Sequence, residues 1–301
     1  MSVKLLLTGG AGFVGENIIR QSDPSWEIHV IDQRKGEIER DGLHWHVADL
    51  LDDSELKRIF AQIGPDVAVH TAAISDIDTC EAKPELAERV NVGVTSTIAA
   101  LCREHDTKMI YFSTDSIFDG EQESYRETDP PTPLNVYAKT KVDGERIVMT
   151  EVPYWVIVRP SLVMGLPVGE VGNSFLWKMI QSAKKGESVA FPKNEIRTPV
   201  NVITLSRSVL ELAGRRISGH FHLSGNDSLS RFDMAVRICR RLGYPAEFVV
   251  DKKPTITTGR ARRPENASLS NAKANRILKT PMMGLEEGLD LVIENRGTKE
   301  L

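Results

Sequence analysis

The chain has 301 residues, of which 41% are hydrophobic and 27% charged, and its net charge at pH 7 is −4. These values are typical of a globular protein with a sizeable core, and the negative charge argues against a nucleic-acid surface as the main function. Cys80, Cys102 and Cys239 are far apart and not in metal-ligand spacing. We therefore expect no disulfide framework and no metal site, and a reducing cytoplasmic setting. We also expect no signal peptide, because a strand begins at residue 3, and no membrane span, because no apolar run is long enough.

A glycine-rich turn follows the apolar run that opens the chain. Gly9, Gly12 and Gly15 lie between this predicted strand and a predicted helix, with Phe13 and Val14 between the last two. Glycine tolerates the backbone angles of such a turn and lets backbone N–H groups approach a pyrophosphate at the helix N-terminus. The spacing and its strand-to-helix context predict a dinucleotide site in this turn. The alternative is a plain tight turn.

The next predicted strand, residues 26–32, ends in Asp32, twenty residues after Gly12. A carboxylate at this position can accept hydrogen bonds from the adenosine ribose hydroxyls, which favours NAD. Arg34 is close by and suits a 2′-phosphate. NAD is therefore the predicted cofactor, and NADP remains open.

Strands and helices alternate through the first half of the chain. Further strands are predicted at 43–48, 66–70, 109–112 and 156–159, with helices at 52–62, from Pro84 and at 135–149. This alternation predicts an α/β fold with a doubly wound parallel sheet, whose ligands bind at the C-terminal strand ends. The cofactor-binding residues predicted at that edge, besides those already named, are Asp49, Leu50, Ala72, Ala73 and Ile74.

The second half has shorter elements and more glycine and proline. We predict a helix near 174–184, an extended run at 198–203 and a late strand at 220–223. Residues 1–163 are predicted to form the cofactor domain, to which some elements of about 198–223 return. Residues 164–301 are predicted to form mainly a smaller lobe that binds the substrate.

Tyr137 and Lys141 are four residues apart in a predicted helix, so both lie on one helix face. A neighbouring ammonium is expected to lower the pKa of the tyrosine, which can then exchange a proton with a carbonyl or alcohol. Thr114, after the fifth strand, can hydrogen-bond the substrate oxygen. The three residues are the predicted catalytic group. The alternative is an exposed helix face beside a turn.

These residues resemble the extended short-chain dehydrogenases/reductases, which have a Rossmann-type sheet. Within that group the sequence is most similar to the dTDP-4-dehydrorhamnose reductase branch. The resemblance is carried by residues 8–15, 112–120 and 136–145 and by the Arg-Pro-x-x-x-Ser-Leu segment 263–269.

The resemblance implies a nucleotide-sugar substrate and hydride transfer between a nicotinamide and a sugar carbon, with Tyr137 handling the proton. It implies that Asn91 helps the cofactor site and that Asn173, Arg197 and Arg263 lie near the nucleotide diphosphate. An arginine fork suits a diphosphate, although each of these residues also fits a plain surface role.

Two departures from the family pattern concern the substrate. Ser116 replaces the tyrosine that faces the sugar in the reductase branch, which places the rhamnose precursor in doubt. Asp115-Ser116 also replaces the Asp-Glu pair of the 4,6-dehydratases. The sequence leaves three functions open: a reductase, an epimerase with the same catalytic group, and a non-catalytic regulatory subunit that binds NAD(P). A homodimer is left open as well.

Overall fold

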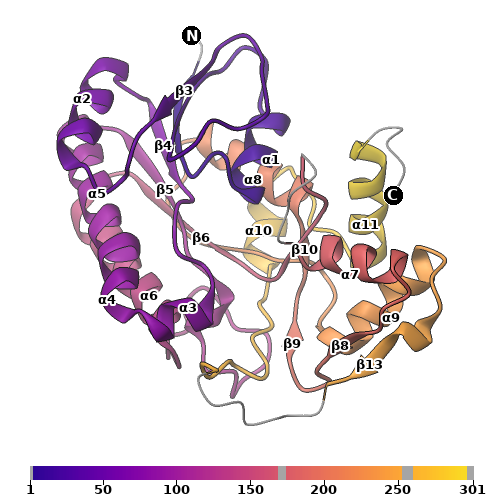
Figure 1. Cartoon of the computed structure of the whole chain (residues 1–301). Helices are drawn as coiled ribbons and strands as arrows, with labels where there is room; N and C mark the ends of the chain where they lie inside the picture. Colours follow the sequence, from indigo (N-terminus) through magenta and orange to yellow (C-terminus); the bar gives the residue numbers. More distant parts are fainter. Residues whose placement is uncertain (1–2, 169–173, 253–259, 297–301) are drawn as a thin grey trace.

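The structure is a computed structural model of the chain in which residues 3–168, 174–252 and 260–296 are described. Its centre is a seven-stranded sheet in which all neighbouring strands are parallel (Figure 1). From one edge to the other the strands are β11 (Gly219–Leu223), β6 (Trp155–Pro160), β5 (Lys108–Phe112), β4 (Val67–His70), β1 (Lys4–Thr8), β2 (Glu27–Asp32) and β3 (Leu43–Val47). The predicted doubly wound parallel sheet is confirmed.

Helices cover both faces of this sheet (Figure 1). One face carries α1 (Phe13–Gln21), α8 (Val202–Ala213) and α10 (Ala272–Ile277). The other carries α2 (Asp53–Ile63), α5 (Val94–Glu104) and α6 (Val136–Glu151). Leu5, Leu6 and Leu7 are fully buried in succession, as a strand covered on both sides requires.

The long helix predicted from Pro84 is interrupted by a π-helical turn. It consists of α4 (Pro84–Ala87), the π turn Glu88–Gly93 and α5. The π turn adds a residue to one helical turn and so rotates the buried face. Asn91 is buried as a result, whereas Val90, which regular helical spacing assigns to the core, is only half-buried. A short helix, α3 (Ile77–Ala82), precedes this stretch.

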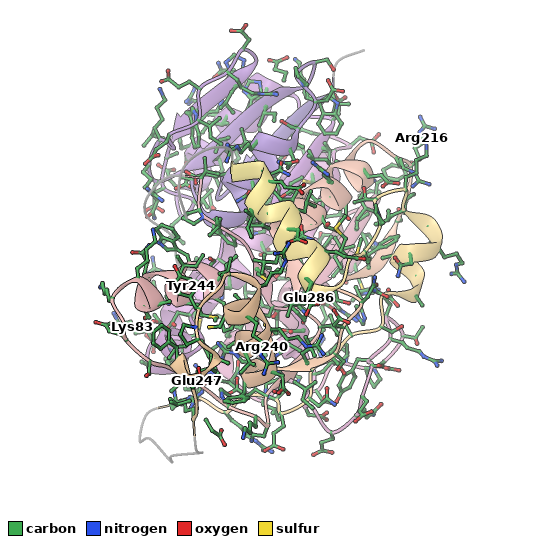
Figure 2. All side chains as sticks on the ribbon, turned by 90° about the vertical axis from the view of Figure 1, so that its right-hand side faces the viewer. Lys83, Arg216, Arg240, Tyr244, Glu247 and Glu286 are labelled. Carbon is green, nitrogen blue, oxygen red and sulfur yellow. The ribbon has the colours of Figure 1, made fainter. Side chains whose placement is uncertain are left out.

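A second apolar cluster lies beside the sheet, at the lower right of Figure 1. The elements that contribute to it include β7 (Val163–Met164), α7 (Phe175–Lys184), β8 (Val189–Phe191), β12 (Leu229–Ser230), α9 (Arg231–Arg241), β13 (Val249–Asp251) and α11 (Leu285–Arg296). The short strands β9 (Ile196–Arg197) and β10 (Val200–Asn201) pair with β12 and β7. Short 3₁₀ turns span Asp115–Ile117 and Ala246–Phe248. Helix α11 lies in front in Figure 2.

The late strand predicted at 220–223 is observed as β11, parallel to β6. The extended run predicted at 198–203 is wrong in its second half. Only Val200–Asn201 pair as a strand, because the Asn201 side chain accepts a hydrogen bond from the Thr204 amide at 2.8 Å and begins α8 at Val202. The domain boundary near residue 163 stays a prediction. Among the described residues, no helix combines the length and apolar character needed to cross a membrane.

Candidate active site at the C-terminal edge of the sheet

The glycine turn between β1 and α1 is packed too closely for side chains. Gly9 has a φ of +73°, and a Cβ there would lie 2.8 Å from the Ala72 backbone nitrogen. A Cβ on Gly15 would lie 2.4 Å from the Gly9 carbonyl oxygen. The first helix therefore packs directly against the turn, at a distance that only glycine allows.

The N-terminus of α1 lacks the side-chain cap that begins several of the other helices. No side chain caps it at Gly12, whereas Asp52, Asn135 and Ser174 cap α2, α6 and α7. First-turn N–H groups that lack a side-chain acceptor are well suited to an anionic ligand such as a pyrophosphate. This feature of the turn fits a dinucleotide.

Asp32 and Arg34 hold the glycine turn from the end of β2. The Asp32 carboxylate accepts a hydrogen bond from the Ala11 amide at 3.0 Å, and Arg34 Nη2 donates to the Ala11 carbonyl at 2.7 Å. Asp32 is half-buried and Arg34 exposed. Phe13 lies against the second apolar cluster, and Val14 packs against the sheet.

The other predicted cofactor residues follow the ends of β3 and β4, so all lie at the same edge of the parallel sheet. Asp49 is exposed, and its carboxylate accepts from the Leu51 amide at 3.0 Å. Leu50 packs against the core. Ala72, Ala73 and Ile74 are half-buried in the segment after β4.

Asn91 acts on that segment from the π turn. Its Oδ1 accepts from the Ile74 amide at 2.8 Å, and its Nδ2 donates to the Ile74 carbonyl at 3.1 Å and to Thr140 Oγ1 at 3.0 Å. Asn91 therefore connects the segment after β4 to α6. These contacts define a positioning role for Asn91.

The predicted catalytic group comes together where β5 ends and α6 begins. The Asn135 side chain accepts from the Ala138 amide at 2.9 Å and starts α6, which puts Tyr137 in its first turn. The Thr114 hydroxyl lies close enough to Tyr137 to lower the pKa of the phenol, and it donates its own proton to Asp115 Oδ1 at 3.3 Å. Lys141, one turn later, has its Nζ 4.3 Å from the Tyr111 ring centroid. All three predicted residues are buried.

The electrostatics of this group differ from the prediction. Burial raises the pKa of Tyr137, an effect that Thr114 opposes only in part. Burial lowers the pKa of Lys141 to about 7, against the Glu145 charge, which raises it. The expectation that Lys141 lowers the pKa of Tyr137 is therefore wrong for this structure. Withdrawal from water is the largest cause of the shift, and Lys141 is not among the groups named beside it, which are Thr114, Asp115 and Cys80.

A buried carboxylate, which the sequence analysis named only in the comparison with the 4,6-dehydratases, lies next to Thr114. Asp115 accepts hydrogen bonds from Ser161 Oγ at 2.9 Å and from Ser116 Oγ at 3.2 Å. Arg197 Nε lies 3.6 Å from its Oδ2. Burial raises the pKa of Asp115, and Arg197 opposes this shift. Ser116, predicted to face the sugar, is thus held within this network.

The arginines predicted to bind a diphosphate both contact the protein itself. Arg197 is 7% exposed and donates to the carbonyls of Ile196, Pro264 and Glu265 at 2.7–3.2 Å. Arg263 forms a bidentate pair with Asp78 of α3, at 3.0 and 2.8 Å. Their role as ligands stays a prediction, and so does that of Asn173, which lies outside the described residues.

Cys80 also belongs to this region, although no sequence pattern places it there. It packs with Tyr137 and Ala87, and its Sγ donates to the Ile74 carbonyl at 3.3 Å. Burial raises the pKa of its thiol. The described cysteines are all free.

The order of the strands and the position of the glycine turn place this chain among the extended short-chain dehydrogenases/reductases. Residues 3–297 match the family described as the RmlD substrate binding domain, and the chain belongs to this family. The resemblance stated from the sequence is thereby confirmed.

Three comparisons illustrate the relationship. The chain is 28% identical to the methionine adenosyltransferase 2 subunit beta of Rattus norvegicus, over 96% of this chain and 87% of the relative. It is 26% identical to a probable low-salt glycan biosynthesis reductase of Haloferax volcanii, over 94% and 95% of the two chains. The crystal structure of a dTDP-4-dehydrorhamnose reductase from Bacillus anthracis, in complex with NADP, superposes with a TM-score of 0.87 at 25% identity and covers 98% of this chain and 100% of that one.

Proposed function

We propose that this chain is an NAD(P)-dependent reductase that acts on a keto group of a nucleotide-linked sugar. One observation carries the proposal: Thr114, Tyr137 and Lys141 lie near one another at the C-terminal end of β5. The glycine turn lies at the same edge of the sheet. The similarity to a reductase structure that contains NADP supports the same reading.

A bound nicotinamide would supply the hydride, and the chain's own residues would handle the proton. Burial keeps the Tyr137 phenol protonated at neutral pH, which is the form that a proton donor to a developing alkoxide needs. The Thr114 hydroxyl, which lies close to Tyr137, would hold the same oxygen in place. Lys141, one helical turn after Tyr137, would bind the nicotinamide ribose through its ammonium group.

Which cofactor is used belongs to the proposal as well. Asp32 at the end of β2 supports NAD, whereas the exposed Arg34 and the NADP of the bacterial reductase support NADP. We propose NAD as the main cofactor and NADP as the alternative. A homodimer remains a prediction.

The test is an assay of purified chain with NADH or NADPH and a panel of 4-keto sugar nucleotides. A reductase consumes the reduced nicotinamide, which is followed by its absorbance. An epimerase changes the sugar without net consumption. We expect Tyr137→Phe to lower the rate by about 10²- to 10⁴-fold while cofactor binding is kept, because only the proton donor is lost.

Two further variants sharpen this assay. Lys141→Ala should weaken both turnover and cofactor binding. Tyr154→Phe is the matched control, because Tyr154 is an exposed tyrosine away from the site, and it should leave the rate unchanged. Normal turnover by Tyr137→Phe would rule out the proposed proton transfer.

The second candidate is a regulatory subunit that binds the cofactor without turnover. It is favoured by the similarity to the beta subunit from rat, whose name makes it part of a larger assembly. The buried catalytic group argues against it, because a protein that only binds a nicotinamide has no need of a proton donor. Cofactor binding with no turnover and no sugar change on any substrate of the panel would favour this second candidate.

A further inference from the structure

Three histidines and a glutamate lie side by side at the β3 edge of the sheet. Glu27 and His29 alternate along β2 and therefore share one face. His44 of β3 is directly opposite His29, and His46 follows two residues later on the same face. The His29 ring stacks with those of His44 and His46, with centroids 4.7 and 5.3 Å apart.

The possible metal-binding atoms of three of these residues converge. His29 Nε2 lies 2.9 Å from Glu27 Oε1, and His44 Nε2 lies 3.9 Å from the same oxygen. All three groups offer a ligand atom within 4.8 Å of the others. Tetrahedral zinc with bonds of about 2.0–2.2 Å separates its ligand atoms by roughly 3.3 Å. Small side-chain rotations bring the three atoms to that spacing.

His46 occupies the position of an outer partner. Its Nε2 lies 3.0 Å from His29 Nδ1. A metal-bound imidazole commonly donates its other N–H to a neighbouring acceptor, which fixes the ring and its tautomer. With His29 Nε2 on a metal, Nδ1–H would donate to His46.

We propose that Glu27, His29 and His44 bind a divalent transition-metal ion of the zinc class, with His46 as the outer partner of His29. Two imidazoles and a carboxylate form a ligand set that zinc uses in proteins. The side chains of Glu27 and His44 are 36% and 51% exposed, so the fourth position faces water.

The proposed ion would stabilise the sheet edge and take no part in the chemistry. Glu27 is the first residue of β2 and Asp32 the last, so the three proposed ligands, Glu27, His29 and His44, lie in the half of the strand away from the cofactor edge. A metal shared by β2 and β3 would hold the outermost strand, whose residue Val47 is 62% exposed, against the sheet. This proposal is independent of the proposed function.

The experiment is a titration of the untagged, chelator-treated full chain with Co²⁺, followed by its visible absorption, and with Zn²⁺ in competition. We expect one ion per chain with the intense visible bands of tetrahedral Co²⁺, displaced by Zn²⁺. His44→Gln should abolish these bands, and because His44 is largely exposed, this variant keeps the fold. Glu27→Gln should weaken binding strongly, and His46→Gln by about tenfold or more.

The matched control is His105→Gln, which removes an exposed histidine at the end of α5, away from the cluster. It should bind Co²⁺ as the unaltered chain does. Hydrogen exchange gives a second readout: Zn²⁺ should slow exchange of the β3 amides in the unaltered chain and not in His44→Gln. Binding that survives His44→Gln, or that falls equally in His44→Gln and His105→Gln, would overturn the proposal.

Discussion

The two regions predicted to bind phosphate groups differ in how they are built. At the glycine turn the proposed ligands are backbone N–H groups, and no side chain caps the helix there. In the second region the proposed ligands are Arg197 and Arg263, whose guanidinium groups bind protein carbonyls and Asp78. A turn of glycines leaves its N–H groups available, whereas an arginine can be used by the fold itself. The first region is therefore the better-supported anion site.

The largest effect expected from this comparison is that of Arg197→Met on stability. This change leaves the Asp115 carboxylate buried without its cation and removes the donors to three carbonyls. Loss of one partner of a buried pair costs about 3 kcal/mol or more, so the free energy of unfolding in urea should fall by about that amount.

Arg216→Met is the control for this measurement, because Arg216 projects from the edge of the molecule (Figure 2). It should change the free energy of unfolding by no more than about 0.5 kcal/mol. If Arg197→Met were as stable as the unaltered chain and only its KM for the nucleotide sugar rose, Arg197 would be a substrate ligand and the contrast between the two regions would disappear.

A somewhat smaller effect is expected for Gly15→Ala in the glycine turn. The new Cβ would lie 2.4 Å from the Gly9 carbonyl oxygen and 2.6 Å from Gly10 Cα, so backbone must move. Overpacking of this kind costs about 1–3 kcal/mol, and calorimetry should also show weaker NAD(P) binding. Gly93→Ala is the control, because its Cβ would meet nothing closer than 4.0 Å. Equal cofactor affinity in the two variants would show that the glycine turn does not bind the cofactor.

The contrast also explains what the sequence could predict. The glycine turn and the Tyr137–Lys141 pair are local patterns, in which spacing along the chain fixes spacing in the fold. The partners of Arg197 are Asp115 and residues 264–265, which are far away in sequence. Their approach depends on tertiary packing that one sequence does not reveal.

The pKa values show the same limit. The sequence places an ammonium beside a phenol, but the sign of the pKa shift of Tyr137 depends on burial, which spacing does not give. The π turn is equally hidden, because the apolar residues around Asn91 follow a regular helical period. In both cases the sequence predicts where the residue lies along its helix but not how deeply its side chain is buried.

Histidines of β4 and β11 that are withdrawn from water should make the central sheet sensitive to mild acid. Burial lowers the pKa of His70 and of His222 to about 3 and that of His220 to about 4, from 6.5. Between about pH 4 and 6.5 the unfolded chain therefore binds more protons than the folded chain. Stability that is present above pH 6.5 is lost as the pH falls, by about 1.4 kcal/mol per pH unit for each imidazole.

Urea unfolding measured between pH 7.5 and 5 tests this, since most carboxylates titrate below that range. His70 bridges Thr8 of β1 and Thr95 of α5 in the cofactor half, and His222 lies on β11 and binds the Tyr125 carbonyl. A free energy of unfolding that stays constant from pH 7 to 5 would show that these imidazoles are not buried as described.

The smallest effect is expected for the choice of cofactor. It tests the role of Asp32, whose carboxylate supports the glycine turn. Asp32→Asn keeps a group that accepts from the Ala11 amide but removes the charge, so the turn stays supported. A carboxylate repels a 2′-phosphate, and its loss next to Arg34 should weaken NAD and improve NADP by severalfold each, about 1 kcal/mol. Kd values from fluorescence titration with both cofactors measure the change. Asp49→Asn, which alters another exposed carboxylate at the same edge, should shift the ratio less. If the ratio of the two Kd values does not change in Asp32→Asn, Asp32 supports the turn and does not contact the adenosine ribose.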